Sequence, residues 1–325
     1  RPCFRFAGGH RMVDLTTKIG SLTLKNPIMP ASGTFSEELA QLFDLECLGA
    51  HVTKTITREK RSGNPTPRVC EVRGSMLNSI GIPSKGLDAF KANVIPFYER
   101  YSAPLIVSIS AGSADEFASL CEDISVPGVA GIEVNISCPN IEEDGKAFAM
   151  RPSTTYAVMQ KLRQATDLPL WAKLTPNTGE TTEVAKAAEE AGADALVVSN
   201  TLLAMAIDIH TRRPKLGNLM GGLSGPAFKP IALRMAYQCA KSVNIPVIGC
   251  GGISTVEDVI EYLIAGAVAV QIGTATFLEP KIMVRMIDGL DAYLKLQGFQ
   301  SVGQLVGSVE DDEASDGLVF MEAAP

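Results

Sequence analysis

The chain has 325 residues, a net charge of −7, and a composition that is 46% hydrophobic and 20% charged. This balance excludes a wholly disordered chain, and the acidic excess argues against a nucleic-acid-binding protein. No apolar run approaches the roughly 18 residues of a membrane-spanning helix, so we expect no membrane association.

The two ends differ in composition from the centre. Residues 1–11 contain three arginines and no acidic residue, and we expect them to be a non-native or stray extension. We expect one domain over residues 12–298. Residues 299–325 form a tail that is partly acidic (SVEDDEASDG from residue 308).

The cysteines and histidines indicate the compartment. Seven cysteines are an odd number, they are widely spaced, and no C-x-x-C occurs among them. The three histidines have no metal-ligand spacing. We therefore expect a reduced, cytoplasmic protein with no disulfide framework and no metal site.

Short β-branched runs alternate with amphipathic helical stretches along the chain. The helical patterns include residues 182–191, 228–242 and 255–265. The runs lack polar alternation, as is typical of parallel strands buried on both faces. Eight such units predict an α/β protein with a single-domain (β/α)8 (TIM) barrel, and a doubly wound open sheet is the alternative. The strands are expected at residues 27–32, 51–56, 105–110, 131–137, 170–174, 195–200, 246–250 and 268–272.

Three segments between these elements are long. Residues 57–86, 138–153 and 201–227 all follow the carboxyl ends of strands. Barrel active sites are built on that face, so these segments indicate a catalytic face.

Glycines end the last two predicted strands. Gly251 and Gly252 follow one strand and precede a helix, and Gly273 and Thr274 follow the next. Barrels often bind phosphate with these two loops and a helix N-terminus. We therefore expect a phosphate site here, although tight turns without a ligand would have the same composition.

Lysines and asparagines mark other strand ends. Lys54 and Lys173 lie within apolar strands, where a buried ammonium favours an anionic or polar ligand. A snorkelling lysine is the alternative. Amides recur at the same face and suit a flat heterocycle with alternating N–H and C=O groups. These amides are Asn78, Asn135, Asn140 and Asn200.

Cys138 closes a strand and starts a long loop. A strand-end cysteine at this face is placed to meet a substrate as nucleophile or general base. A nucleophilic cysteine usually needs an activating histidine, and none stands in such a context, so proton abstraction is favoured.

Several motifs together resemble the class 1 dihydroorotate dehydrogenases. They are NISCPN from residue 135, GNPTPR from residue 63, LNSIG from residue 77, NTL from residue 200 and GGLSGP from residue 221. Residues 200–230 look most like the NAD-linked subclass 1B. The similarity runs from about Leu15 to about Gly298.

The resemblance implies an FMN-dependent oxidoreductase of pyrimidine (UMP) biosynthesis that oxidises dihydroorotate to orotate. Cys138 would remove the C5 proton while the C6 hydride passes to the flavin, and Lys54 would contact both flavin and substrate. The orotate pocket would add Asn78, Ser79, Ile80, Gly81, Ile82, Asn135, Asn140, Asn200 and Thr201. The flavin site would comprise Ala31, Ser32, Gly33, Lys54, Thr55, Ser108, Asn135, Lys173, Val198, Ser199, Gly225, Gly251, Gly252, Gly273 and Thr274.

Two features depart from the family, and neither removes a catalytic group. The loop after Cys138 carries the acidic run Glu142, Glu143 and Asp144, which would disfavour an anionic substrate nearby unless it points outward. Ser108 stands where the family usually has an asparagine beside the flavin, so one hydrogen bond to the cofactor is expected to be weaker or water-mediated.

The resemblance also implies partners. The chain would form a homodimer, and a heterotetramer with an electron-transfer subunit that carries FAD and a [2Fe–2S] cluster and reduces NAD⁺. Three alternatives stay open. They are a self-contained class 1A enzyme that uses fumarate, a dihydropyrimidine dehydrogenase-like subunit, and a phosphate-binding barrel that serves only as a scaffold or sensor.

Overall fold

The computed structural model describes residues 13–137 and 148–310, and its centre is a sheet of eight parallel strands. Their spatial order is β3–β16–β15–β10–β9–β8–β7–β4. In chain order the strands are β3 (Ile28–Pro30), β4 (His51–Val52), β7 (Leu105–Ile109), β8 (Gly131–Val134), β9 (Leu170–Lys173), β10 (Ala195–Val198), β15 (Val247–Cys250) and β16 (Ala269–Ile272).

The barrel closes between its first two strands. The Gly49 amide, just before β4, donates to the carbonyl of Ile28 on β3 at 2.9 Å. A Cβ at Gly49 would lie 2.1 Å from the carbonyl oxygen of Asn26, so this close approach requires glycine. The predicted (β/α)8 barrel is confirmed.

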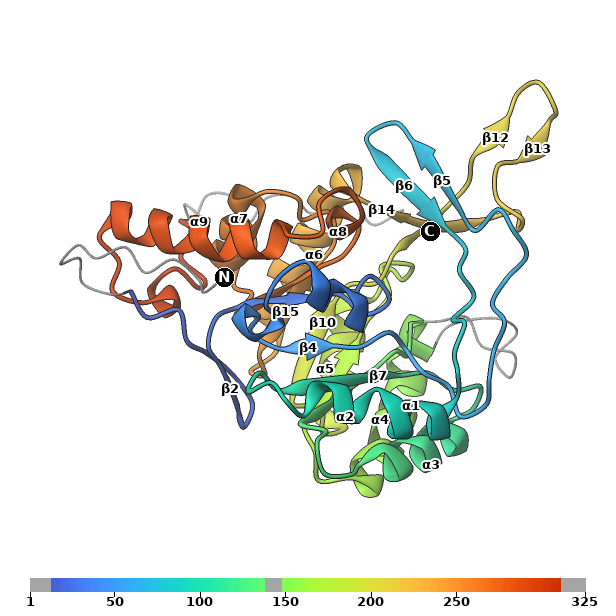
Figure 1. Ribbon diagram of the computed structural model, residues 1–325, viewed down its shortest axis with the longest axis horizontal. Coiled ribbons are helices and arrows are strands. Elements are labelled where there is room, and N and C mark those ends of the chain that lie inside the picture. The colour runs from blue at the N-terminus through green and yellow to red at the C-terminus, as the bar shows by residue number, and fades with distance from the viewer. Residues whose placement is uncertain (1–12, 138–147, 311–325) are drawn as a thin grey trace, which may run out of the picture.

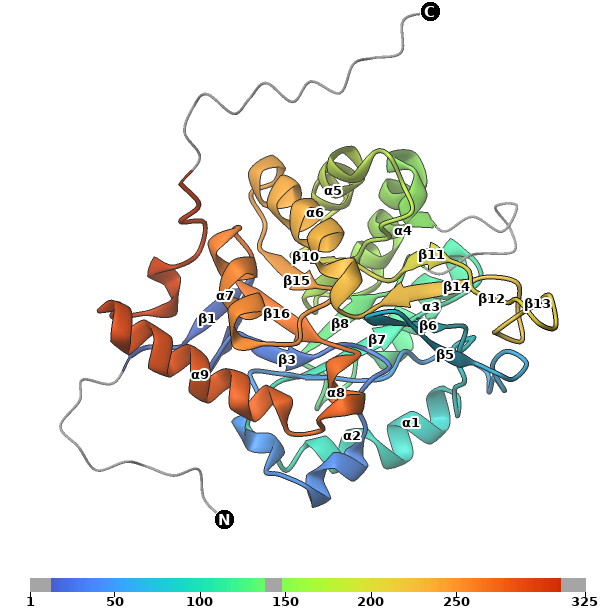
Figure 2. The same cartoon turned by 90° about the horizontal axis from the view of Figure 1, so that it is seen from above.

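Helices surround the sheet, as Figure 2 shows in the view from above. The predicted helices at 182–191, 228–242 and 255–265 are confirmed as α5, α6 and α7, and short 3-10 helices follow β3 in place of an α-helix. The α-helices are α1 (Leu87–Asn93), α2 (Ile95–Tyr98), α3 (Ala114–Ile124), α4 (Pro152–Ala165), α5 (Thr181–Glu190), α6 (Lys229–Ser242), α7 (Val256–Ile264), α8 (Ala275–Leu278) and α9 (Ile282–Gln297). The 3-10 helices are η1 (Glu37–Gln41), η2 (Leu45–Cys47), η3 (Phe148–Met150), η4 (Pro226–Phe228) and η5 (Val302–Gln304).

The period of two along each strand divides the apolar side chains into two cores. On β9, Leu170 and Ala172 pack in the layer between sheet and helices, whereas Trp171 packs inside the barrel. A hairpin of β1 (Thr17–Ile19) and β2 (Leu22–Leu24) adds Ile19 and Leu24 to the inner core. The two cores explain why the strands read as uninterrupted apolar runs.

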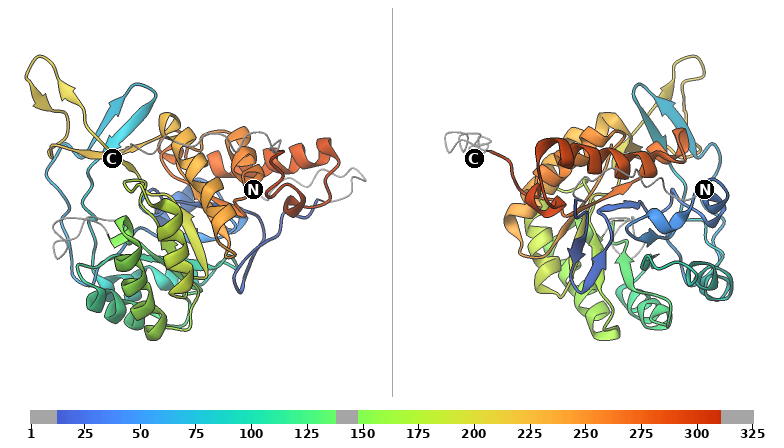
Figure 3. Two further views of the ribbon diagram at one scale, coloured as in Figure 1. Left: turned by 180° about the vertical axis from the view of Figure 1, so that it is seen from behind. Right: turned by 60° about the vertical axis from the view of Figure 1, so that its left-hand side comes forward.

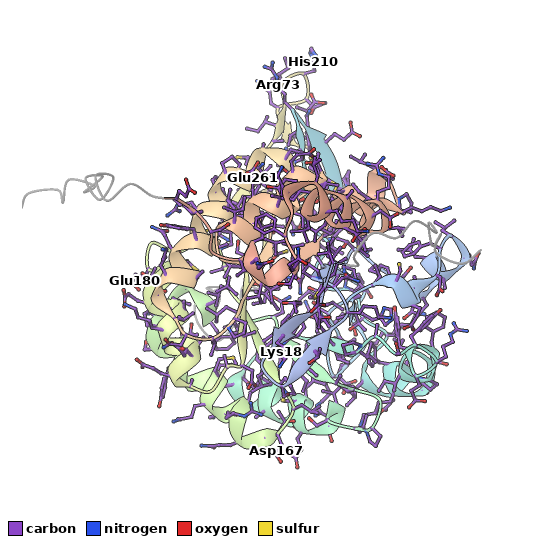
Figure 4. All side chains as sticks on the ribbon, turned by 90° about the vertical axis from the view of Figure 1, so that its left-hand side faces the viewer. Lys18, Arg73, Asp167, Glu180, His210 and Glu261 are labelled. Atoms are coloured by element: carbon purple, nitrogen blue, oxygen red, sulfur yellow. The ribbon has the colours of Figure 1, made fainter. Side chains whose placement is uncertain are left out.

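Two of the long segments contain strands that the sequence pattern did not reveal. They form an antiparallel sheet in the order β11–β14–β6–β5 and a separate hairpin of β12 and β13. Both project beyond the barrel in Figures 1 and 3, and Figure 4 labels Arg73 and His210 at the tip of this projection. The strands are β5 (Val69–Val72), β6 (Ser75–Asn78), β11 (Leu202–Ala204), β12 (Ile207–Asp208), β13 (Arg213–Pro214) and β14 (Gly221–Ser224).

Packing against the barrel continues past the expected boundary at residue 298. Val302 and Leu305 are buried in the outer core, and Ser301 forms a parallel bridge with Asp14. Residues 299–305 therefore contribute to the fold. Among the described residues, no helix combines the length and apolar character needed to cross a bilayer.

Candidate active site

The carboxyl ends of the barrel strands place the predicted residues on one face. Asn135 and Ser137 follow β8, Ser199 and Asn200 follow β10, and Thr55 lies beyond β4. Parallel strands align these ends, so residues up to 145 positions apart in the sequence meet here.

Amide and hydroxyl groups form a connected cluster at this face. The Asn200 side-chain amide donates to Ser137 Oγ at 2.5 Å, and Ser137 Oγ donates to Asn135 Oδ1 at 2.6 Å. Asn135 Nδ2 in turn donates to Thr55 Oγ1 at 3.4 Å. These bonds fix the asparagine side chains that the sequence predicts for the substrate.

Lys54 directly precedes Thr55 of this cluster in the chain and is half-buried. Its ammonium makes no hydrogen bond or ion pair within residues 13–137 and 148–310. Burial, and then the nearby Arg68 guanidinium, lower the pKa of Lys54. A half-buried cation without an anionic partner fits a site for an anionic ligand.

Lys173 occupies a different environment, inside the barrel. Its ammonium donates to Ser32 Oγ at 3.0 Å and to Gln271 Oε1 at 3.1 Å, and it pairs with Glu133 at 3.4 Å. The sequence predicted an anionic ligand for Lys173 but missed that Glu133 is its counter-ion. The available signal was a carboxylate in the middle of a buried strand.

The projecting sheet supplies the remaining substrate residues. Asn78 ends β6 opposite Gly222 of β14, and its side chain donates to the Gly222 carbonyl at 3.2 Å. A Cβ at Gly222 would lie 1.9 Å from Thr201 Oγ1, so Thr201 lies against the same strand. Sequence analysis treated this region as loop, yet it placed Asn78 and Thr201 on the same side of the molecule.

Residues 79–82 follow directly and hold a tight conformation. Ser79 Oγ accepts bonds from Asn64 at 2.9 Å and from Asn218 at 3.0 Å. Gly81 and Ile82 have φ of 77° and 48°. The Ile80 carbonyl accepts the Asn64 amide at 3.0 Å, which anchors the predicted segment Ser79, Ile80, Gly81 and Ile82.

The glycine turn after β15 has the bare backbone expected of a phosphate cradle. Gly251 and Gly252 have φ of 140° and 70°. A Cβ at Gly252 would lie 2.5 Å from the Lys229 backbone nitrogen. Side chains are therefore excluded from this turn.

The neighbouring helix terminus differs from expectation. The amides of Ser254 and Thr255, at the start of α7, donate to the Asp258 carboxylate at 2.7 and 2.9 Å. A phosphate would have to use the glycine turns rather than these two N–H groups, because Asp258 already caps them.

The other predicted flavin residues lie around this face. Ala31 bonds to the Ile272 carbonyl at 2.8 Å, and Ser199 bonds to the Cys250 carbonyl at 2.8 Å. Thr274 Oγ1 donates to Ser224 Oγ at 2.7 Å, next to Gly225. Gly33, Val198 and Gly273 are neighbours of these residues in the sequence.

Ser108 is tied to the barrel interior. Its hydroxyl donates to Glu133 Oε1 at 3.0 Å and lies 2.9 Å from Thr55 Oγ1. The serine, which is shorter than the asparagine expected here, therefore donates its hydrogen bond to the Glu133 carboxylate. Cys138 and Asn140 lie outside the described residues, so their predicted roles stay predictions.

The residues present fit FMN. The bare glycine turns suit its phosphate, the amide and hydroxyl cluster suits a ring with alternating donors and acceptors, and Lys54 has no anionic partner within residues 13–137 and 148–310. This combination makes the carboxyl face of the barrel a candidate oxidoreductase site.

Comparison with known proteins agrees with this geometry. The family model described as dihydroorotate dehydrogenase matches residues 14–294. The chain is similar to "Dihydroorotate dehydrogenase B (NAD(+)), catalytic subunit" from three bacteria. Identity is 46% with the Geotalea uraniireducens protein over 299 residues, 91% of this chain and 98% of that protein. It is 46% with the Caldicellulosiruptor bescii protein over 299 residues, 91% and 99% of the two chains. It is 44% with the protein of Thermoanaerobacter sp. (strain X514) over 302 residues, 92% and 100% of the two chains. The chain therefore belongs to the dihydroorotate dehydrogenase family.

Proposed function

We propose that this protein is the catalytic subunit of an NAD-linked dihydroorotate dehydrogenase and acts in pyrimidine biosynthesis. One observation carries the proposal most directly. Lys54 is half-buried, has no anionic partner in the described chain, and directly precedes Thr55, which accepts a hydrogen bond from an ordered set of amides. Dihydroorotate offers a carboxylate for the cation and alternating N–H and C=O groups for the amides.

The chain's own groups have separate tasks in the reaction. Lys54 binds the substrate carboxylate, and the amides of Asn78, Asn135 and Asn200 fix the plane of the ring. Cys138 removes the C5 proton as a general base. FMN, when bound, supplies the acceptor for the hydride that leaves C6.

The residues proposed to hold FMN divide by the part of the cofactor they meet. The glycine turns at Gly251, Gly252 and Gly273 would receive the phosphate. Lys173 would place positive charge beside the pyrimidine edge of the ring, which favours the negative charge that the ring gains on reduction. Ser32, Thr55 and Ser108 would complete the polar surround.

The proposed electron path leaves this chain. The matched proteins are named as NAD(+)-linked catalytic subunits, which supports a separate electron-transfer subunit carrying FAD and a [2Fe–2S] cluster. The composition of the chain, with its reduced-compartment cysteine pattern, supports a cytoplasmic location.

A homodimer is supported by the projection. Leu203, Ile207, Ile209 and Leu219 lie on it and are half or more exposed, with Ile209 80% exposed. Exposed apolar groups of this size mark association surfaces, and a second copy of this chain would bury them. Ile209→Asp should shift the protein from dimer to monomer in sedimentation equilibrium. An unchanged dimer would place the interface elsewhere.

Ligand binding and re-oxidation distinguish the alternatives. We expect orotate to bind the yellow protein and uracil to bind far more weakly, since uracil lacks the carboxylate. Tight uracil binding would favour a dihydropyrimidine dehydrogenase-like enzyme. After reduction by dihydroorotate, re-oxidation by NAD⁺ with the partner subunit is expected. Rapid re-oxidation by fumarate alone would identify a self-contained class 1A enzyme. A protein that binds no flavin would favour a phosphate-binding barrel that serves only as a scaffold or sensor.

A further inference from the structure

A buried ion pair lies inside the barrel below the proposed flavin site. Glu133 on β8 and Lys173 on β9 approach to 3.4 Å, and their side chains are 0% and 4% exposed. Charges at this depth are costly unless each is paired and hydrogen-bonded.

The three groups that hydrogen-bond to Glu133 within the described residues are all donors. Ser108 Oγ donates to Oε1 at 3.0 Å, Gln271 Nε2 donates to Oε2 at 2.7 Å, and Lys173 approaches Oε1. A carboxylate, which only accepts, satisfies all three, whereas a protonated acid or an amide would set donor against donor.

Glu133 also orients Gln271. Because the Gln271 amide nitrogen faces Glu133, its carbonyl oxygen is turned to Lys173 at 3.1 Å. Ser32 Oγ, at 3.0 Å, is the third acceptor for the same ammonium. The three protons of Lys173 therefore meet three acceptors, two of which depend on Glu133.

We propose that Glu133 is a positioning residue that acts through Lys173 and Gln271 to hold a positive charge beside the bound flavin, and so sets its redox potential. The inference rests on the proposed function, since it requires FMN at this face. Glu133 itself has its oxygens occupied by protein donors. It acts on the cofactor only by holding the ammonium in place.

The isosteric variant Glu133→Gln tests this role in the FMN-loaded protein. The new amide places N–H groups among the donors that surround residue 133, so the Gln271 amide must turn. Lys173 then loses two acceptors, the carboxylate of Glu133 and the carbonyl oxygen of Gln271. An ammonium left in this interior without a counter-ion is costly and turns away toward water, so positive charge beside the flavin ring is lost. Two quantities report that charge, namely the midpoint potential of the flavin and the dissociation constant of its sulfite adduct.

We expect Glu133→Gln to weaken sulfite binding by about tenfold or more and to make the midpoint potential more negative. Lys173→Met should shift both in the same direction and further. The double variant should match Lys173→Met alone, because Glu133 acts through Lys173. Glu122→Gln, on the exposed face of α3, removes the same charge at the surface and should change neither value.

Unchanged or tighter sulfite binding in Glu133→Gln would overturn the inference, as would effects that multiply in the double variant. If Glu133→Gln does not fold, Gln271→Leu keeps the ion pair and removes only the bridging amide. It should give a smaller loss in the same direction, and equality with the wild type would contradict the account. A wild-type protein that binds no FMN would overturn the proposed function as well, whereas a yellow protein with an unaffected variant overturns this inference alone.

Discussion

The interior of the barrel changes character along its axis. Strand β9 turns Trp171 into the half near the amino ends of the strands and Lys173, two residues later, into the half near the carboxyl ends. Strand β7 does the same with Ile106 and Ser108. Two residues of a strand span only about 6.6 Å, so an apolar core and a buried ionic cluster are adjacent.

The half near the amino ends of the strands, here called the lower half, stabilises the fold. The half near the carboxyl ends, the upper half, carries the groups proposed to act on the flavin. Apolar side chains in the lower half stabilise the folded state simply by leaving water. The buried charges of the upper half are at best neutral for stability compared with apolar groups of the same size. Changes in the upper half should therefore alter flavin chemistry more than the free energy of unfolding, and changes in the lower half should do the reverse.

The largest effect is expected at Cys138, the predicted base. Cys138→Ala should leave the protein yellow but slow flavin reduction by dihydroorotate by about 10²- to 10⁴-fold, since a general base contributes that much. Stopped-flow absorbance of the flavin band measures the rate. Cys239→Ala changes a buried cysteine of α6 outside the site and should keep the wild-type rate. Rapid reduction in Cys138→Ala would refute the assignment of the base.

In the lower half, Trp171→Ala should have the opposite signature. Emptying this fully buried position should cost about 3–5 kcal/mol in the free energy of unfolding, measured with urea, while the folded protein still binds FMN.

Trp171→Phe is the matched control, because the indole N–H has no hydrogen-bond partner in the described chain and its loss carries no polar penalty. It should cost clearly less than alanine. A Trp171→Ala protein that is as stable as the wild type but loses FMN would contradict the division of the barrel into two halves.

His51, on β4, tests whether the layer between sheet and helices tolerates charge as poorly as the lower half of the barrel interior should. It is fully buried between Tyr98 and Tyr101, and burial lowers the pKa of His51 to about 4. The unfolded state therefore binds the proton more tightly, so this contribution to stability is complete above pH 6.5 and is lost as the pH falls toward 4. The loss by pH 4 should reach about 3 kcal/mol.

Urea unfolding at pH 7 and at pH 4.5 measures this term. His51→Phe keeps an aromatic ring in place and removes the titration, so its stability should fall less over this interval than that of the wild type. Equal losses in the two proteins would show that His51 does not contribute.

The smallest effect is expected at Ser108. Ser108→Ala removes one donor to Glu133 and one hydroxyl contact with Thr55, and it should lower the free energy of unfolding by about 1–2 kcal/mol. Ser153→Ala, on the exposed side of α4, should change nothing. A loss as large as that of Trp171→Ala would mean that the upper half also supports the fold.

The sequence predicted the barrel because buried parallel strands and amphipathic helices leave strong periodic signals. It also predicted that Lys54, Asn135 and Asn200 lie at the carboxyl ends of strands, where the structure has them, since polar residues at the ends of apolar strands are conspicuous. It did not reveal strands β11 and β14, which are short and partly exposed. It also missed that Glu133 pairs with Lys173, because only the folded sheet shows which neighbouring strands bring two charges together.

An anaerobic titration of the purified protein with dihydroorotate tests the central claim most directly, since it requires the flavin, the substrate site and the base together. We predict that the yellow colour bleaches with one dihydroorotate per bound flavin and that orotate is the product. A flavin that stays oxidised in excess dihydroorotate would contradict the account.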